Sequence, residues 1–284
     1  MDHPNHDKSN RSLALNVITP FLIWAGVILL FVNVKHLPFE LNENGQLALR
    51  HTTKIIATIF LPLALIFLLH KNKADFGIYF PKTKGALRLA WQAYAIGGPA
   101  CMTFLYIGLM GWGLHDWPSA MSLAAVFSLV AYVIPRITKN LANDLPSQKS
   151  LKPIFLFVIL SLVTLVVAYF TNGLVPYLWR VLYYLFLVAL GEEMFFRGYM
   201  QSAMNRYFGK PFSMGGVSFG WGLVLAALAF GLIHALVATP PTWPHALWTF
   251  IFGLSLGYLR EKEGSILVAV FFHALMDMPL AFIG

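Results

Sequence analysis

The sequence is poor in charge and in cysteine. Of its 284 residues, 11% are Asp, Glu, Lys or Arg and 58% are hydrophobic, and the mean hydropathy is +0.68. A soluble domain carries about 25% charged residues, so this composition excludes an ordinary soluble protein. Cys101 is the only cysteine, which excludes an intrachain disulfide. It lies in an apolar run with no His or Asp nearby in the sequence, so we interpret it as a buried, inert thiol and not as a nucleophile.

Long apolar runs recur along the chain and predict an all-α, polytopic membrane protein. Nine runs are candidate spans: Leu13–Val34, His51–Leu69, Leu89–Trp112, Ser119–Pro135, Pro153–Phe170, Pro176–Met200, Gly220–Val237, His245–Leu259 and Ser265–Ile283. The first run is longer than the apolar core of a signal peptide, and no small-residue cleavage site follows it. We therefore expect this run to remain in the protein as a membrane anchor.

Lysine and arginine are distributed unevenly between the two sides that nine alternating spans create. Sixteen of the 20 fall on the side of the segments 71–88 and 136–152, and the other four are Lys35, Arg50, Lys54 and Arg180. Because positive residues concentrate in cytoplasmic loops, this pattern predicts a cytoplasmic N-terminus and a C-terminus outside. Topology then accounts for the net charge of +8, and no nucleic-acid partner is expected.

A polar segment, Thr138–Lys152, separates four predicted spans from five. We therefore predict two regions: residues 1–150, a membrane region of about four spans with no assigned function, and residues 151–284, a helical core. Nearly all ionisable residues inside the predicted spans belong to the second region. An ionisable side chain at membrane depth is costly unless it has a partner, so these residues are candidates for function.

The first group of charges inside a span lies in the stretch GEEMFFRGYM, residues 191–200. Glu193 and Arg197 are four residues apart, so on a helix they share a face and can pair. Glu192 lies about 100° around the helix from Glu193 and points elsewhere. One glutamate is then neutralised by the arginine, and the other remains available for chemistry. The alternative is that this stretch is the interfacial end of a span, with Arg197 extending to the membrane surface.

Two histidine motifs follow, FGLIH and HALMD. Phe230 and His234 share a helix face, although a single histidine at such a position is equally consistent with a core or interfacial residue. His273 and Asp277 also share a face, in the last predicted span, where they either satisfy each other or complete a site. The stretch Gly253–Gly257 fits the nucleophile pattern G-x-S-x-G, but that pattern requires a strand-to-helix turn. Its glycines, four residues apart, favour close packing between helices instead.

The three motifs EEMFFR, FGLIH and HALMD occur in one order, within the last third of the chain. Together they resemble the hallmarks EExxxR, FxxxH and HxxxN or HxxxD of the CAAX-processing and bacteriocin-processing (CPBP, or Abi) family of intramembrane proteases. The resemblance implies a CPBP-like helical core and an endopeptidase that cleaves a membrane-tethered peptide or protein with a glutamate-activated water. No motif assigns a function to the first 150 residues.

The resemblance also implies a role for each motif residue. Glu192 is the general base, assisted by His234, and burial in a low-dielectric pocket makes a glutamate a better base. His273 is the donor to the developing oxyanion. Glu193 and Arg197 brace the site.

Two features of the motifs fit this scheme less simply. Asp277 stands where the family also uses asparagine, and an ionised aspartate repels an oxyanion. It is either protonated or holds His273 as an oriented imidazolium, and we favour the second. For Glu192 to meet His234, the sixth span must continue past Arg197 towards Phe208, and His234 must lie deeper than its predicted boundary.

Two other classes of protein remain open at this stage. In a zinc protease, the ligands would come from Glu192, Glu193, His234, His273 and Asp277. The chain has no H-E-x-x-H motif and the glutamate chemistry needs no metal, so we expect no cofactor. A non-catalytic scaffold, immunity factor or transporter also buries Glu, His and Asp, although the absence of an inverted repeat counts against transport. In each case the lipid bilayer is a partner.

Overall fold

The computed structural model of the chain describes residues 9–33, 43–69, 73–79, 83–140, 159, 163, 166, 176–238 and 240–279. Over these residues the structure is helical apart from turns and one short hairpin, which confirms the all-α class. Most of the fifth predicted span, Pro153–Phe170, lies outside the described residues.

The N-terminal region forms long helices that match its predicted apolar runs. Its elements are α1 (Asn10–Leu13), η1 (Ala14–Ile18), α2 (Thr19–Asn33), α3 (Glu43–Ile55), η3 (Ile56–Phe60), α4 (Leu61–Leu69), the short turn η4 (Lys73–Phe76), α5 (Thr83–Leu109) and α6 (Trp117–Thr138). The second helix begins at Glu43, eight residues before the predicted boundary at His51. The longer helix includes Arg50, which is exposed, and Lys54, which is partly buried, although the charge pattern treats both as flanking residues.

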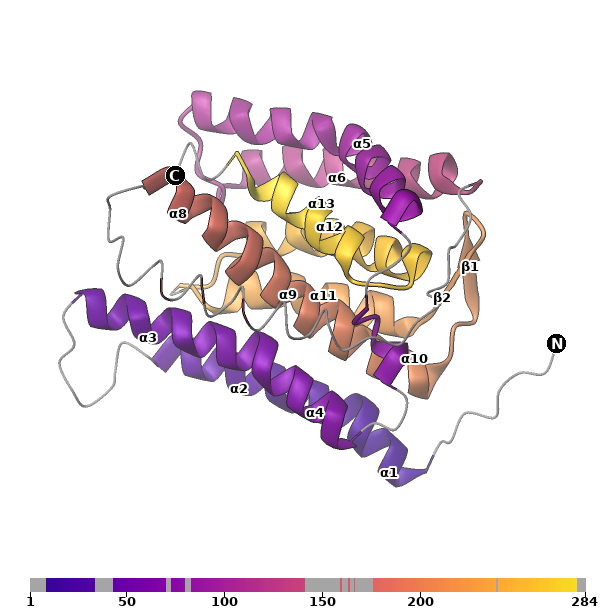
Figure 1. Cartoon of the computed structure of the whole chain (residues 1–284). Coiled ribbons are helices and arrows are strands. Elements are labelled where there is room, and N and C mark those ends of the chain that lie inside the picture. The colour runs from indigo at the N-terminus through magenta and orange to yellow at the C-terminus, as the bar shows by residue number, and fades with distance from the viewer. Residues whose placement is uncertain are drawn as a thin grey trace.

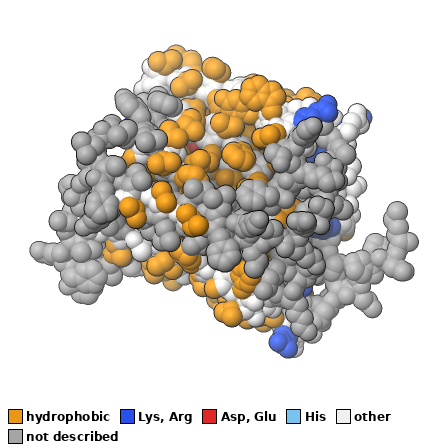
Figure 2. All heavy atoms as spheres, in the orientation of Figure 1, with side chains coloured by type: hydrophobic (Ala, Val, Ile, Leu, Met, Phe, Trp, Pro, Cys, Tyr) orange, Lys and Arg blue, Asp and Glu red, His pale blue; other side chains and the backbone are white. Residues whose placement is uncertain are grey.

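Three helical stretches in the described residues are long and apolar enough to cross a membrane: Asn10–Asn33, Leu49–Leu69 and Trp117–Thr138. Figure 2 shows hydrophobic side chains spread over much of the described part of one face, with Lys and Arg towards its edges. Such a surface suits contact with lipid. The chain is therefore an integral membrane protein, whereas the nine spans and the orientation of the termini stay predictions.

One continuous helical rod crosses the centre of the molecule (Figure 1). It consists of α8 (Pro176–Leu182), η5 (Tyr183–Leu190), α9 (Gly191–Glu193), η6 (Met194–Gln201) and α10 (Ser202–Phe208). The elements α3, η3 and α4 pack on one side of the rod, and α13 (Leu267–Asp277) packs against η5. The rod extends eight residues beyond the predicted end at Met200, to Phe208, so Glu192 lies near its middle.

A two-stranded hairpin links this rod to the next helix, α11 (Trp221–Leu236). Strands β1 (Phe212–Met214) and β2 (Val217–Phe219) pair antiparallel, with Met214 opposite Val217. Gly215 and Gly216 form the turn, both with positive φ, as a two-residue turn of this kind requires. The all-α prediction omitted this hairpin, although two glycines between apolar residues are a hairpin signal.

The long helix α12 (Trp243–Glu263) packs along α11 and contacts α6 and α13. Its glycines make the close contacts expected of them: a Cβ at Gly253 would lie 3.2 Å from Ala227, and one at Gly257 would lie 2.8 Å from Leu223. Ser255 lies within this continuous helix, so the G-x-S-x-G pattern here is a packing motif and not a nucleophile turn.

A buried polar cluster fixes the end of the rod to α12. Glu261 accepts hydrogen bonds from Gln201 at 2.7 Å and Asn205 at 3.0 Å, and pairs with Lys210 at 2.5 Å. Arg260 donates to Ser202 at 2.8 Å and is 4% exposed. Arg260 is therefore a packed structural residue and not the loop charge that the topology count assumed.

Candidate active site

The three motifs meet at one oxygen of Glu192. From α9, Glu192 Oε2 lies 3.9 Å from Nε2 of His234 on α11 and 3.9 Å from Nε2 of His273 on α13. This oxygen is buried and has no hydrogen-bond partner among the described residues. Buried polar atoms are normally paired, so an unpaired oxygen between two imidazoles identifies a position where a small polar molecule fits.

Lys54, a residue outside the three motifs, contacts the other oxygen of Glu192. Lys54 on α3 places its Nζ 2.8 Å from Oε1, and the two side chains are only 17% and 11% exposed. Lys54 is not among the predicted site residues, because the charge pattern counts it as a flanking charge. Its position in the second apolar run could have indicated a site residue, because burying a charge within a span is as costly for Lys54 as for Glu192.

Glu193 and Arg197 form the predicted pair, and both side chains are fully buried. The Oε1 atom of Glu193 lies 2.9 Å from NH1 of Arg197. Arg197 also donates to the Gly253 carbonyl at 3.2 Å. This burial is inconsistent with the alternative in which Arg197 extends to the membrane surface.

His273 lies between carboxylates. Its Nδ1 is 2.8 Å from Glu193 Oε1, and its Nε2 is 3.4 Å from Asp277 Oδ2 one helical turn away. The same Glu193 oxygen therefore contacts both Arg197 and His273. Together with Asp277, this chain of contacts joins the first and third motifs into one buried network.

His234 is oriented by its own helix. Its Nδ1 lies 2.6 Å from the backbone oxygen of Phe230. Because a carbonyl only accepts, Nδ1 carries the proton, and in the neutral ring Nε2 presents its lone pair towards Glu192. The i, i+4 spacing of the FGLIH motif therefore sets the histidine tautomer through the backbone.

The phenyl ring of Phe230 explains the first residue of that motif. It packs against His234 at 4.6 Å and His273 at 5.8 Å between ring centroids, and the Arg197 guanidinium lies 4.4 Å from its centre. One aromatic side chain thus contacts both histidines and contributes a cation–π contact to the buried arginine.

The two glutamates lie where the rod changes its winding. The short α-helical segment Gly191–Glu193 is flanked by the π-helical segments η5 and η6. π-helical turns are rare and often occur at functional sites, because they rotate side chains away from the regular helical positions.

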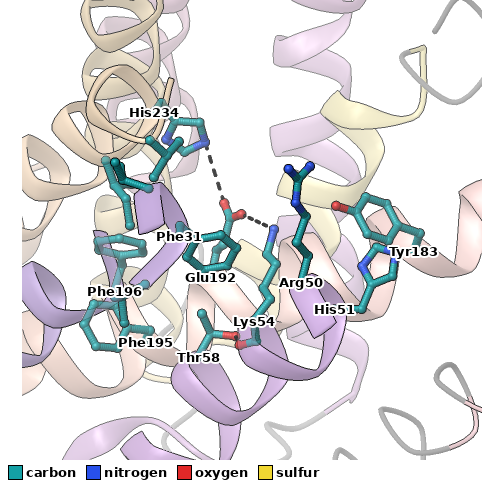
Figure 3. A pocket seen from close by; sticks show the side chains of 14 residues that line it. Phe31, Arg50, His51, Lys54, Thr58, Tyr183, Glu192, Phe195, Phe196 and His234 are labelled. Carbon is teal, nitrogen blue, oxygen red and sulfur yellow. Dashed lines mark hydrogen bonds and ion pairs between the residues drawn. The ribbon is translucent and has the colours of Figure 1, made fainter. Parts of the chain in front are cut away.

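A cavity of about 560 Å³ opens onto Glu192 and His234 (Figure 3). Its walls combine aromatic and aliphatic side chains with the cations Arg50 and Lys54. The volume is within the range of small-molecule and peptide sites, about 300–1,000 Å³. His273 is 3% exposed and is not part of the wall, so Glu192 connects it to the cavity.

The two glutamates that could bind a zinc ion already have other partners. Within the part of the chain that the structure describes, no three His, Cys, Asp or Glu side chains are placed to hold one metal. Lys54 already occupies one oxygen of Glu192, and Glu193 is engaged by Arg197 and His273.

The fold and this geometry define a helical membrane protein with a buried carboxylate–histidine site enclosed by several helices. Residues 174–279 match a family model described as type II CAAX prenyl endopeptidase Rce1-like. The match contains all three motifs and confirms the resemblance to the CPBP family over this segment. It indicates a peptidase, a hydrolase of peptide bonds. Neither a search of curated proteins nor a search of solved structures gave a match.

Proposed function

We propose that this chain is an intramembrane endopeptidase that cleaves a membrane-tethered peptide or protein with a water activated by Glu192. One observation carries the proposal: the unpaired Oε2 of Glu192 lies 3.9 Å from Nε2 of both His234 and His273, at the edge of an open cavity. The family to which residues 174–279 are similar is described as a prenyl endopeptidase, which favours peptide-bond hydrolysis over a scaffold or transporter.

The proposed base is the pair formed by Glu192 and His234. Their facing atoms both accept hydrogen bonds, and 3.9 Å is too far for a direct bond between them. A water that donates one hydrogen to each satisfies both atoms. Glu192 takes a proton from this water as its oxygen bonds to the carbonyl carbon of the substrate. The proton then passes to the amide nitrogen as the C–N bond breaks, which leaves a carboxylic acid and an amine.

The proposed oxyanion donor is His273. Glu193 at one ring nitrogen and Asp277 at the other favour the imidazolium form, whose Nε2 lies 3.4 Å from Asp277 Oδ2 and 3.9 Å from Glu192 Oε2. A donor fixed in this way stabilises charge that develops on the carbonyl oxygen where water is excluded. Because His273 lies behind Glu192, this role requires the scissile carbonyl to enter beside the Glu192 carboxylate. Asp277 then orients the donor, and Glu193 and Arg197 hold it in place.

The proposed substrates are tethered to the membrane, because the site lies within a bundle whose surface is apolar. A prenylated C-terminus is one member of this class, and a leader peptide or a sorting signal is another. We propose no metal cofactor, since the contacts around Glu192 suit proton transfer and not metal ligation. We also propose that the chain divides into two regions at residue 150 and that its N-terminus is cytoplasmic.

The proposal is tested by mass spectrometry of membrane peptides from cells that carry the wild type or the Glu192→Ala variant. We expect uncleaved substrates to accumulate with the variant at equal protein levels. Identical peptide populations would contradict the proposal. Repeating the measurement on wild-type membranes with a strong chelator separates the zinc alternative, for which cleavage stops and returns when zinc is added. Our proposal predicts that the chelator changes nothing.

A further inference from the structure

Lys54 lies outside the family match, yet it contacts the central carboxylate of the site. Its Nζ is 2.8 Å from Glu192 Oε1, within hydrogen-bond distance, and the match begins only at residue 174. In Figure 3 the Glu192 carboxylate lies between Lys54 on one side and His234 on the other. The N-terminal region therefore contributes a charged side chain to a site that the three motifs otherwise build.

The helix that carries Lys54 packs tightly on the central helical rod, α8 to α10. A Cβ built on Gly191 would lie 2.6 Å from Oγ1 of Thr58, so the residue before Glu192 admits a close approach of the second helix. Thr58 in turn donates to the Lys54 carbonyl at 2.7 Å. This glycine contact fixes the distance between the lysine backbone and the glutamate.

Aromatic contacts hold the same helix one turn earlier. The His51 ring lies 5.1 Å from Tyr183 and 5.7 Å from Trp179, both on the rod. The Lys54 ammonium also lies 5.9 Å from the Tyr183 ring. The lysine is therefore supported from both sides along its helix, and its position does not depend on the ion pair alone.

The contact restricts what Glu192 can do. A carboxylate with one oxygen fixed by an ammonium keeps the other oxygen at a defined place, here facing the two histidines. Without Lys54, Glu192 would be a buried carboxylate with no Lys or Arg within ion-pair distance among the described residues. Its side chain would then be free to rotate towards the nearest other donor, which lengthens the reacting distances.

We propose that Lys54 is a positioning residue for the base Glu192, so that the second helix of the N-terminal region is part of the active site. This inference rests on the proposed function. The inference concerns one side chain and one carboxylate oxygen. It gives a function to the N-terminal region, which contains none of the three motifs. Lys54 acts through Glu192 and does not itself react.

The test compares membrane peptides of cells that express the full chain as wild type, Lys54→Met, Lys54→Arg, Lys139→Met or Glu192→Gln. We expect Lys54→Met to lower cleavage about 10- to 100-fold, the effect of a reacting group displaced by about 1 Å. Lys54→Arg, which keeps a cation in reach, restores most of it. Lys139 is exposed at the end of α6, so Lys139→Met removes the same charge away from the site and leaves cleavage unchanged.

Thermal unfolding of the purified variants in one detergent separates positioning from folding. If Lys54→Arg restores cleavage and the unfolding temperatures of the variants are unchanged, the result supports a role of Lys54 in positioning Glu192. If Glu192→Gln stops cleavage but Lys54→Met matches the wild type, the inference on Lys54 is wrong and the proposed function stands. If Glu192→Gln also matches the wild type, the proposed function itself fails. Loss of activity in both Lys54 variants, together with equal losses of unfolding temperature, would make Lys54 a structural residue and overturn the inference.

Discussion

Replacing Glu192 by glutamine is expected to lower the rate of peptide-bond cleavage by about 1,000-fold, since a general base contributes about 10²–10⁴-fold. Glutamine keeps the size of the side chain and its hydrogen-bonding oxygen, but it takes no proton from water. The measurement is the initial rate of cleavage by the purified, full-length protein in lipid, with a peptide identified from the membrane comparison. Binding of that peptide should change much less than the rate.

A matched control replaces a carboxylate that lies away from the cavity. Asp116 is exposed in the turn before α6, where it accepts a hydrogen bond from the Gly113 amide at 2.9 Å. Asp116→Asn preserves that acceptor and should leave the rate of cleavage unchanged. Equal rates for Glu192→Gln and the wild type would show that another group activates the water.

The second large effect is expected at Arg197, through stability as well as activity. Its guanidinium pairs with Glu193 where both side chains are 0% exposed. Removing one partner of a buried ion pair costs about 3–5 kcal/mol, because the remaining charge is left buried. Arg197→Met should therefore lower the free energy of unfolding in mixed micelles by this amount and also abolish cleavage.

A double variant distinguishes the two consequences of losing Arg197. Glu193→Gln combined with Arg197→Met leaves neither charge buried, so part of the lost stability should return. Cleavage should stay low, because His273 has lost the carboxylate at its Nδ1. Arg136→Met is the control, since Arg136 is exposed and surface changes usually stay within about 0.5 kcal/mol. A stable, fully active Arg197→Met variant would contradict the bracing role.

Local spacing made much of the site predictable. Glu193 and Arg197 pair across one turn, as their i, i+4 spacing predicts, and His273 and Asp277 do the same. Glu192 points elsewhere, as the neighbouring position on a helix requires. The extension of the rod to Phe208 also followed from the demand that Glu192 meet His234. The two pairs depend on residues one helical turn apart.

The contacts that the sequence analysis missed join distant parts of the chain. Lys54 and Glu192 are 138 positions apart, and no local pattern indicates which helix packs on which. The same holds for Glu261, whose partners Gln201 and Lys210 lie 60 and 51 positions away in the sequence. Lys54 and Lys210 are not predicted as partners of buried glutamates, because the topology rule counts every Lys and Arg as a residue that flanks a span.

The proposed roles of Glu192, His234 and His273 are tested most directly by a cryo-electron microscopy structure of the Glu192→Gln variant with an uncleaved peptide substrate bound in lipid. Our account predicts that the scissile carbonyl enters the cavity beside residue 192, within hydrogen-bond distance of His273 and with His234 on the side of the attacking water. A peptide whose scissile bond lies away from all three side chains would contradict it.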